Sequence, residues 1–310
     1  MSPLFAASKN GHIDIERHLH NADPNIGNVN HTLSVFNASE NGHVDVIRLF
    51  IQHNSNRNIC NGNNEPPLFI SSSKGHNDFL KLLLEHNCDP GICNNSNESD
   101  LFVASKEGQP DIVNKHDYDY SIYNNNLESA LFISSEEGHI DIVKILLEHN
   151  CDPNICNSEN ESAFFSASLK GRKDIVKLLL EYKCDPNICN NKNDSALFSA
   201  SFRGRADIVK LLLEYNCDPN ICNGKKESAL LIASHGGQAD VVKLLLEHNC
   251  DPNIYNGEKE SALFIASYGG QTDVVKLLLE KNSDPNKCND KKESPLFIAS
   301  MLGHTDHVKL

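Results

Sequence analysis

A repeat of about 33 residues runs through most of the chain, and this period limits the possible fold more than any other feature. The segment from Glu128 reads ESALFISSEEGHIDIVKILLEHNCDPNICN, and close copies begin at Glu161, Asp194, Glu227 and Glu260. One glycine marks each of ten copies, and the interval between successive glycines is constant except after the first and fourth copies, where it is shorter. These glycines are Gly11, Gly42, Gly75, Gly108, Gly138, Gly171, Gly204, Gly237, Gly270 and Gly303. A short unit repeated in this way predicts an array in which each copy packs on its neighbours, without one central core.

The sixth copy shows how one unit is expected to fold. Ser162 stands where a helix N-cap belongs, because its hydroxyl can accept a free backbone N–H. We expect a helix over 163–170 that ends at Gly171, since glycine readily adopts a positive φ. Between Lys173 and Glu181 the polar residues form a single stripe, which predicts a second helix packed on most of its sides. The Asp, Pro and Asn residues that follow favour a turn.

Two short helices and a turn in every copy resemble the ankyrin repeat. The family's T-P-L-H box appears as SALF or SPLF, its helix pattern as GHIDIVKILL from Gly138, and its turn as NCDPN from Asn150. Phenylalanine replaces the box histidine in most copies, so apolar packing must replace the bond that this histidine makes in the family. The resemblance covers essentially the whole chain and implies an all-α ankyrin-repeat solenoid, with a β-turn or hairpin in each copy of the repeat.

The fourth copy departs from this pattern. It reads GQPDIVNKHDYDYSIYNNNL from Gly108, is three residues short and lacks the Leu-Leu-Leu run of the second helix. We therefore divide the continuous array into repeats 1–4 (residues 1–127) and repeats 5–10 (residues 128–310). Either neighbouring copies support this weak one, or it forms a weak joint that a protease would cut near 114–126. The last copy stops at Leu310, halfway through a second helix, which leads us to expect a longer protein.

The charge of the chain argues against several classes of partner. Its formal net charge is −14, whereas proteins that bind nucleic acids or anionic membranes present basic surfaces. The start of the sequence has no basic segment followed by a long apolar stretch. No apolar run approaches the ~20 residues that a membrane-spanning helix needs. We therefore expect a cytoplasmic protein that neither binds nucleic acid nor inserts into membranes.

Eleven cysteines invite a metal or disulfide interpretation. Four copies carry two cysteines five residues apart, but other copies place alanine or serine in the first column, as at Ser283, which indicates a small packed site. Equivalent residues of adjacent copies should lie ~8–10 Å apart. That separation is too large for tetrahedral zinc or a disulfide. We therefore expect free thiols, no metal and no cofactor.

The histidines and carboxylates form no catalytic pattern. His43, His76 and His139 occupy the Gly-His position between the two helices, where the resemblance implies a structural role. No histidine has the nucleophile partner that covalent catalysis requires, and no phosphate-binding glycine loop is present. We therefore expect no enzymatic activity and no catalytic residue.

The candidate binding site lies in the two residues that precede each glycine. Both are polar in the first five copies, whereas in the later copies the first of them is mostly apolar or aromatic. In ankyrin arrays these positions and the turn tips contact the partner, so the resemblance implies a protein partner on the concave face of repeats six to ten. The candidate partner-binding residues are Leu169, Lys170, Phe202, Arg203, His235, Tyr268 and Met301. The carboxylates expected at the turn edge, where they would orient the partner, are Glu161, Asp194, Glu227, Glu260 and Glu293.

Two interpretations of these positions stay open. Stacked copies would align five of them into one exposed stripe, and contiguous apolar surface often marks a binding site. Alternatively, the same residues only pack the adjoining turns, since single exposed apolar residues are common on protein surfaces.

Three hypotheses for function follow from the sequence. The first is a stand-alone or tethered scaffold that binds another protein. The second is the recognition arm of a larger protein such as a kinase, channel or ubiquitin-ligase adaptor, all of which contain ankyrin arrays. The third is a metal-binding or redox role of the cysteine columns. The first two share a binding function, and the fold alone does not choose between them.

Overall fold

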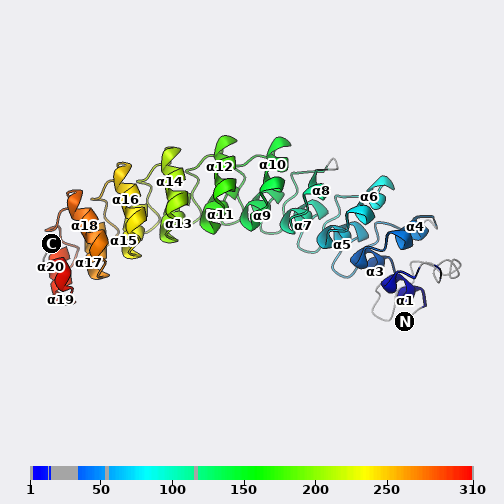
Figure 1. Ribbon diagram of the computed structural model, residues 1–310, viewed down its shortest axis with the longest axis horizontal. Coiled ribbons are helices and arrows are strands. Elements are labelled where there is room, and N and C mark those ends of the chain that lie inside the picture. The colour runs from blue at the N-terminus through cyan, green and yellow to red at the C-terminus, as the bar shows by residue number, and fades with distance from the viewer. Residues whose placement is uncertain (1–2, 13, 15–33, 53–55, 115–117, 309–310) are drawn as a thin grey trace. The chain divides into compact units, whose positions relative to one another are not determined.

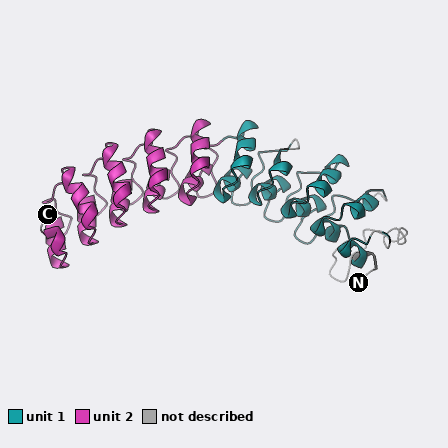
Figure 2. Ribbon diagram, in the orientation of Figure 1, with its two compact units in different colours: residues 1–152 teal, residues 153–310 magenta. Residues whose placement is uncertain are grey.

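The computed structural model of the chain describes residues 3–12, 14, 34–52, 56–114 and 118–308. The described residues form short helices joined by turns, and their only strand-like pairings are three isolated bridges at the turns (Figure 1). The chain divides into two compact units, residues 1–152 and residues 153–310 (Figure 2). The division at residue 127, which was based on the short fourth copy, stays a prediction.

The helices of the first unit are α1 (Pro3–Asn10), α3 (Ser34–Asn41), α4 (Val44–Gln52), α5 (Pro67–Lys74), α6 (Asn77–Glu85), α7 (Asp100–Lys106), α8 (Pro110–Val113), α9 (Ala130–Glu137) and α10 (Ile140–Glu148). The helices of the second unit are α11 (Ala163–Lys170), α12 (Lys173–Glu181), α13 (Ala196–Phe202), α14 (Ala206–Glu214), α15 (Ala229–His235), α16 (Ala239–Glu247), α17 (Ala262–Tyr268), α18 (Thr272–Glu280), α19 (Pro295–Met301) and α20 (Thr305–Val308).

Each unit consists of two layers of helices. In the second unit, the odd-numbered helices α11 to α19 pack side by side in one layer, and the even-numbered helices α12 to α20 form the other (Figure 1). The first unit has the same arrangement, with α1, α3, α5, α7 and α9 in the first layer and α4, α6, α8 and α10 in the second. From α3 onward, every first-layer helix also packs on the second helix of its own copy. The predicted helical repeat solenoid is thereby confirmed.

The first helix of the sixth copy begins and ends where its sequence predicts. The Ser162 hydroxyl caps α11 by accepting the backbone N–H of Phe165 at 3.2 Å. Gly171 follows the helix in the left-handed conformation, with φ of 80°. A Cβ atom at this position would also collide with the guanidinium of Arg205 from the next copy. The guanidinium is the far end of a flexible side chain and could move aside, so the positive φ is the main reason for glycine here.

The second helix of the same copy is held by its apolar face. Helix α12 buries Ile175, Val176, Leu179 and Leu180. On its exposed side Lys177 lies 3.9 Å from Glu181. An exposed ion pair contributes about 0–1 kcal/mol, whereas burying one aliphatic side chain contributes about 1.5–3 kcal/mol. Packing against neighbouring helices, and not the charged stripe, therefore stabilises this helix.

Side chains that cross from one copy to the preceding copy join the copies together. In the first unit the Nε2 atom of His139 lies 3.0 Å from the carbonyl oxygen of Lys106. In the second unit Arg205 takes the same place, and its Nε donates to the carbonyl oxygen of Leu169 at 3.1 Å. The structural role predicted for the Gly-His histidines is confirmed at His139, and an arginine can replace it.

The second residue after each nine-residue helix α6, α10, α12, α14, α16 and α18 adopts the left-handed conformation. Asn150, Asn216 and Asn249 have φ between 59° and 61°, as expected for asparagine at this position. Lys183 occupies the same place in the sixth copy with φ of 60°. A side chain with a Cβ atom costs roughly 1–2 kcal/mol in this conformation, less for asparagine, so the sixth copy carries a small local strain.

The fourth copy keeps only a short second helix. Helix α8 has four residues, whereas α10 and α12 each have nine. Lys115, His116 and Asp117, which replace the apolar core in the sequence, lie outside the described residues. Further along, Tyr118 is buried, and the ring of Tyr120 stacks on His149 with centroids 5.1 Å apart. Tyr118 therefore belongs to the core here, whereas the stack joins the half-buried Tyr120 to the exposed His149.

Candidate functional site

A groove crosses the first-layer helices of the second unit, beside the turns that precede them. Its larger part has a volume of about 690 Å³ and lies over α13, α15 and α17. Its smaller part, of about 620 Å³, lies over α11, α13 and α15. Phe202, Lys225, Glu227 and Ile232 line both parts. The two parts therefore form one continuous surface, which we call the groove.

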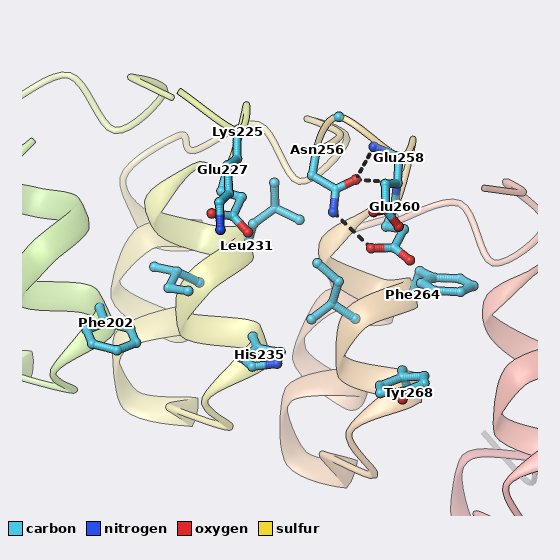
Figure 3. A pocket seen from close by; sticks show the side chains of 13 residues that line it. Phe202, Lys225, Glu227, Leu231, His235, Asn256, Glu258, Glu260, Phe264 and Tyr268 are labelled. Atoms are coloured by element: carbon cyan, nitrogen blue, oxygen red, sulfur yellow. Dashed lines mark hydrogen bonds between the residues drawn. The ribbon is translucent and has the colours of Figure 1, made fainter. Parts of the chain in front are cut away.

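Most of the predicted partner-binding residues lie in this groove. Those that line it are Leu169, Phe202, Arg203, His235 and Tyr268. Figure 3 shows Phe202, His235 and Tyr268 near the ends of the neighbouring first-layer helices α13, α15 and α17, on the same face. Lys170 and Met301 are exposed but line neither part of the groove.

The two aromatic rings of this row are open to solvent. Phe202 is 51% exposed and Tyr268 is 57% exposed. The guanidinium carbon of Arg203 lies 5.6 Å from the centroid of the Phe202 ring, which holds a cation beside this aromatic side chain. Because more than half of each side chain remains accessible, packing within the chain leaves both rings available to a binding partner.

A row of carboxylates lies on the turn side of the groove. In the turn before α17, the side-chain amide of Asn256 donates to Glu260 at 2.9 Å. The Oδ1 atom of Asn256 accepts the backbone N–H groups of Glu258 and Glu260, both at 2.9 Å (Figure 3). The same pair recurs before α15, where Asn223 donates to Glu227 at 2.9 Å. One asparagine therefore closes each turn and fixes the position of a partly buried carboxylate.

The other carboxylates expected at the turn edge have the same arrangement. Their asparagine partners lie four residues earlier in the sequence, at donor–acceptor distances between 3.0 and 3.5 Å. The residues concerned are Glu161, Asp194 and Glu293. The row therefore continues through the turns before α11, α13 and α19.

The apolar floor of the groove and part of its rim were not predicted from the sequence. Ile232 and Ile265 lie three residues before His235 and Tyr268, on the same helix faces. The spacing of three residues places such pairs side by side on a helix, so it could have identified both isoleucines. The rim residue Lys225 belongs to a turn, whose direction the repeat pattern does not give.

The cysteines form no second site. All eleven are free thiols, and burial raises the pKa of Cys184, Cys217 and Cys250 to about 12. Because the thiolate is the reactive and metal-binding form, such thiols are poor nucleophiles and poor ligands near neutral pH. Among the described residues, no group of three or more His, Cys, Asp or Glu side chains could hold a metal ion.

No helix in the described part of the chain has the length and apolar character needed to cross a lipid bilayer.

The repeats of this chain match those of a known protein family. A family model of ankyrin repeats, built from three copies, matches residues 4–95, 36–122, 101–190, 167–256 and 230–310. These overlapping segments cover almost the whole chain. None of the curated proteins matches it.

Proposed function

This chain belongs to the ankyrin-repeat family, whose members generally bind other proteins, and we propose that it is a scaffold that binds a protein partner. The partner would occupy the groove, on the concave face of repeats six to ten. The observation that supports this proposal is the row of half-exposed side chains, Phe202 and Tyr268 above all, beside a row of fixed carboxylates. Contiguous exposed apolar surface and aromatic side chains are typical of protein interfaces.

The proposed role needs no catalytic group, metal or cofactor. Ankyrin-repeat proteins are typically non-enzymatic, and a scaffold acts by holding its partner. We also propose a cytoplasmic location. Eleven cysteines that form no disulfide suit a reducing compartment, where glutathione and thioredoxin keep thiols reduced.

The test compares two double variants of the full chain as baits in extracts of the native cell. Phe202→Ala with Tyr268→Ala removes both exposed rings of the groove. Truncation of an aromatic hot spot typically costs about 2 kcal/mol or more, so we expect affinity for the captured partner to fall at least about 30-fold. The midpoint of thermal unfolding should change little, because both side chains are already more than half exposed.

The matched control is Tyr182→Ala with Tyr215→Ala. These two tyrosines are 41% and 40% exposed and follow the second-layer helices α12 and α14, outside the groove. This control variant should bind the captured partner as tightly as the unaltered chain does. Loss of thermal stability with unaltered affinity in the groove variant would show that Phe202 and Tyr268 belong to the core instead.

A further inference from the structure

The groove contains a row of turn carboxylates and a row of helix-end side chains, and the spacing within these rows indicates which partner fits. This inference rests on the proposed function. Helices α13, α15 and α17 pack side by side, and packed helices are ~8–10 Å apart. Each copy supplies one carboxylate at the turn, such as Glu227 or Glu260, and one side chain at the helix end, such as Phe202 or Tyr268. Both rows therefore repeat at about one helix spacing.

The larger part of the groove carries an excess of negative charge. Glu227, Glu258 and Glu260 line it, together with Lys225 and the imidazole of His235. The neighbouring Lys259 does not line this part of the groove and lies 2.7 Å from the carboxylate of Asp290. A partner segment with basic side chains would therefore complement this surface.

The carboxylates are prepared to receive such side chains. The amide of Asn223 or Asn256 uses the Oε2 atom of Glu227 or Glu260, and a carboxylate can accept several hydrogen bonds. Because these side chains are already ordered, little rotamer freedom is lost when a cation binds. The aliphatic stem of an arginine or lysine can lie on apolar residues of the floor, such as Ile232, while its charged end reaches the turn.

The repeat distance favours an extended partner. A polyproline II helix has three residues per turn and a rise of ~3.1 Å, so every third side chain lies on one face at intervals of ~9.3 Å. This interval falls within the ~8–10 Å spacing of packed helices. An α-helical partner places side chains on one face at a comparable distance only every seven residues, at ~10.5 Å.

We propose that the groove over α13, α15 and α17 binds an extended, polyproline II-like protein segment with Arg or Lys at every third position. The basic side chains contact Glu227 and Glu260. The intervening apolar side chains lie among Phe202, Ile232 and Tyr268.

The experiment uses the full chain and two fluorescein-labelled peptides in fluorescence anisotropy at physiological salt. One peptide is (Arg-Leu-Pro)₄, and the other has the same composition with its four arginines, four leucines and four prolines in separate blocks. We expect the periodic peptide to bind at least tenfold more tightly. In the double variant Glu227→Gln, Glu260→Gln this preference should disappear, and the affinity for the periodic peptide should fall at least tenfold.

The matched control variant is Glu128→Gln in the first unit. Glu128 accepts the side-chain amide of Asn124 at 2.7 Å, as the groove carboxylates do, and glutamine preserves this acceptor while removing the charge. The control should bind the periodic peptide like the unaltered chain.

Three results would overturn the inference: equal affinity for the two peptides, unchanged affinity in the Glu227→Gln, Glu260→Gln variant, or tighter binding of a helical peptide with arginine at every seventh position. The proposed function is judged separately. A native partner that is lost with Phe202→Ala, Tyr268→Ala but retained with Glu227→Gln, Glu260→Gln would support the scaffold role and reject the basic, extended segment.

Discussion

The two units are built from the same repeat but differ in their surfaces. Residues 1–152 contain nine Lys and Arg against 21 Asp and Glu, whereas residues 153–310 contain 19 against 21. The core is alike in both, since Leu146 in the first unit and Leu179 in the second are both fully buried. In an array of this kind the core positions set the fold, and the exposed positions are free to differ. The nearly balanced charge and the exposed aromatic row are properties of the second unit.

The units also differ in the regularity of their helices. In the second unit the second helices α12, α14, α16 and α18 all have nine residues. In the first unit α8 has four, and Asp100 lies at the buried position that Ala163 and Ala196 occupy in later copies. The described part of the first unit therefore combines a shortened second helix with a buried carboxyl group.

The largest expected effect comes from repairing the fourth copy. Replacing residues 114–117 by Lys-Leu-Leu-Leu-Glu-His-Asn restores the missing helical turns. Because each buried leucine is worth about 2–5 kcal/mol relative to alanine, the first unit should gain several kcal/mol of unfolding free energy. Limited proteolysis of the unaltered chain should cut first within 114–126, and the repaired chain should resist this cut.

A length-matched insert serves as the control for this repair. Lys-Gln-Gln-Gln-Glu-His-Asn adds the same number of residues without apolar side chains. Equal rates of cleavage for the two inserts would show that chain length, and not the buried face, decides the stability of this copy. A first cut elsewhere in the unaltered chain would reject the weak joint.

The second effect concerns pH and the first unit. Burial raises the pKa of Asp100 to about 7. An unfolded aspartate has a pKa near 4, so between about pH 4 and 7 the folded chain binds more protons than the unfolded chain. Stability should therefore fall as the pH rises through this window, by at most about 4 kcal/mol.

Hydrogen exchange of the amides of α7, corrected for intrinsic rates, measures this fall between pH 5 and 8. The variant Asp100→Asn should remove the pH dependence, because an amide does not titrate. The matched variant Asp111→Asn, which changes an exposed carboxylate of α8, should retain it. If the protection of the α7 amides falls with pH as steeply in Asp100→Asn as in the unaltered chain, Asp100 is not the cause of the fall.

A smaller effect of opposite sign is expected in the second unit. Burial and the neighbouring His304 lower the pKa of His307, whose Nε2 atom lies 3.1 Å from the hydroxyl of Thr272. The unfolded chain then binds more protons than the folded chain just below the usual histidine pKa. Protection of the α18 amides should therefore increase as the pH rises from 5 to 7. His307→Gln should abolish the increase, and an unchanged slope in that variant would contradict this assignment.

The helix ends could be predicted from the sequence because the residues that determine them act locally. Ser162 and Gly171 each act within a few residues, so the ends of α11 could be placed without knowledge of the rest of the chain. Asp100 was missed, although the alanines at the same place in other copies, such as Ala163, indicate a buried position.

Only the row of helix-end side chains in the groove could be predicted from the sequence, and the walls of the groove could not. The helix-end residues Phe202 and Tyr268 recur at a fixed interval, and their stripe follows from stacking alone. The walls come from turns of the following copies, such as the turn of Asn256 and Glu258. Their direction depends on hydrogen bonds within the turn, which the apolar period does not encode. The sequence therefore predicted the row but not the depth of the groove.

The smallest expected effect follows from the charge difference between the units. Like charges in residues 1–152 repel one another, and salt shortens the screening length from about 10 Å at 0.1 M to about 3 Å at 1 M. Raising sodium chloride from 0.05 to 0.5 M should therefore increase protection of the amides of α5 and α7 by up to about 1 kcal/mol, with little change in α13 and α15. Exposed Lys–Glu pairs weaken equally in both units, since Lys81–Glu85 and Lys210–Glu214 share the same spacing and distance. Hydrogen exchange with mass spectrometry on the full chain measures both units in one sample. An equal response of the two units would show that their different net charges do not change how salt affects their stability.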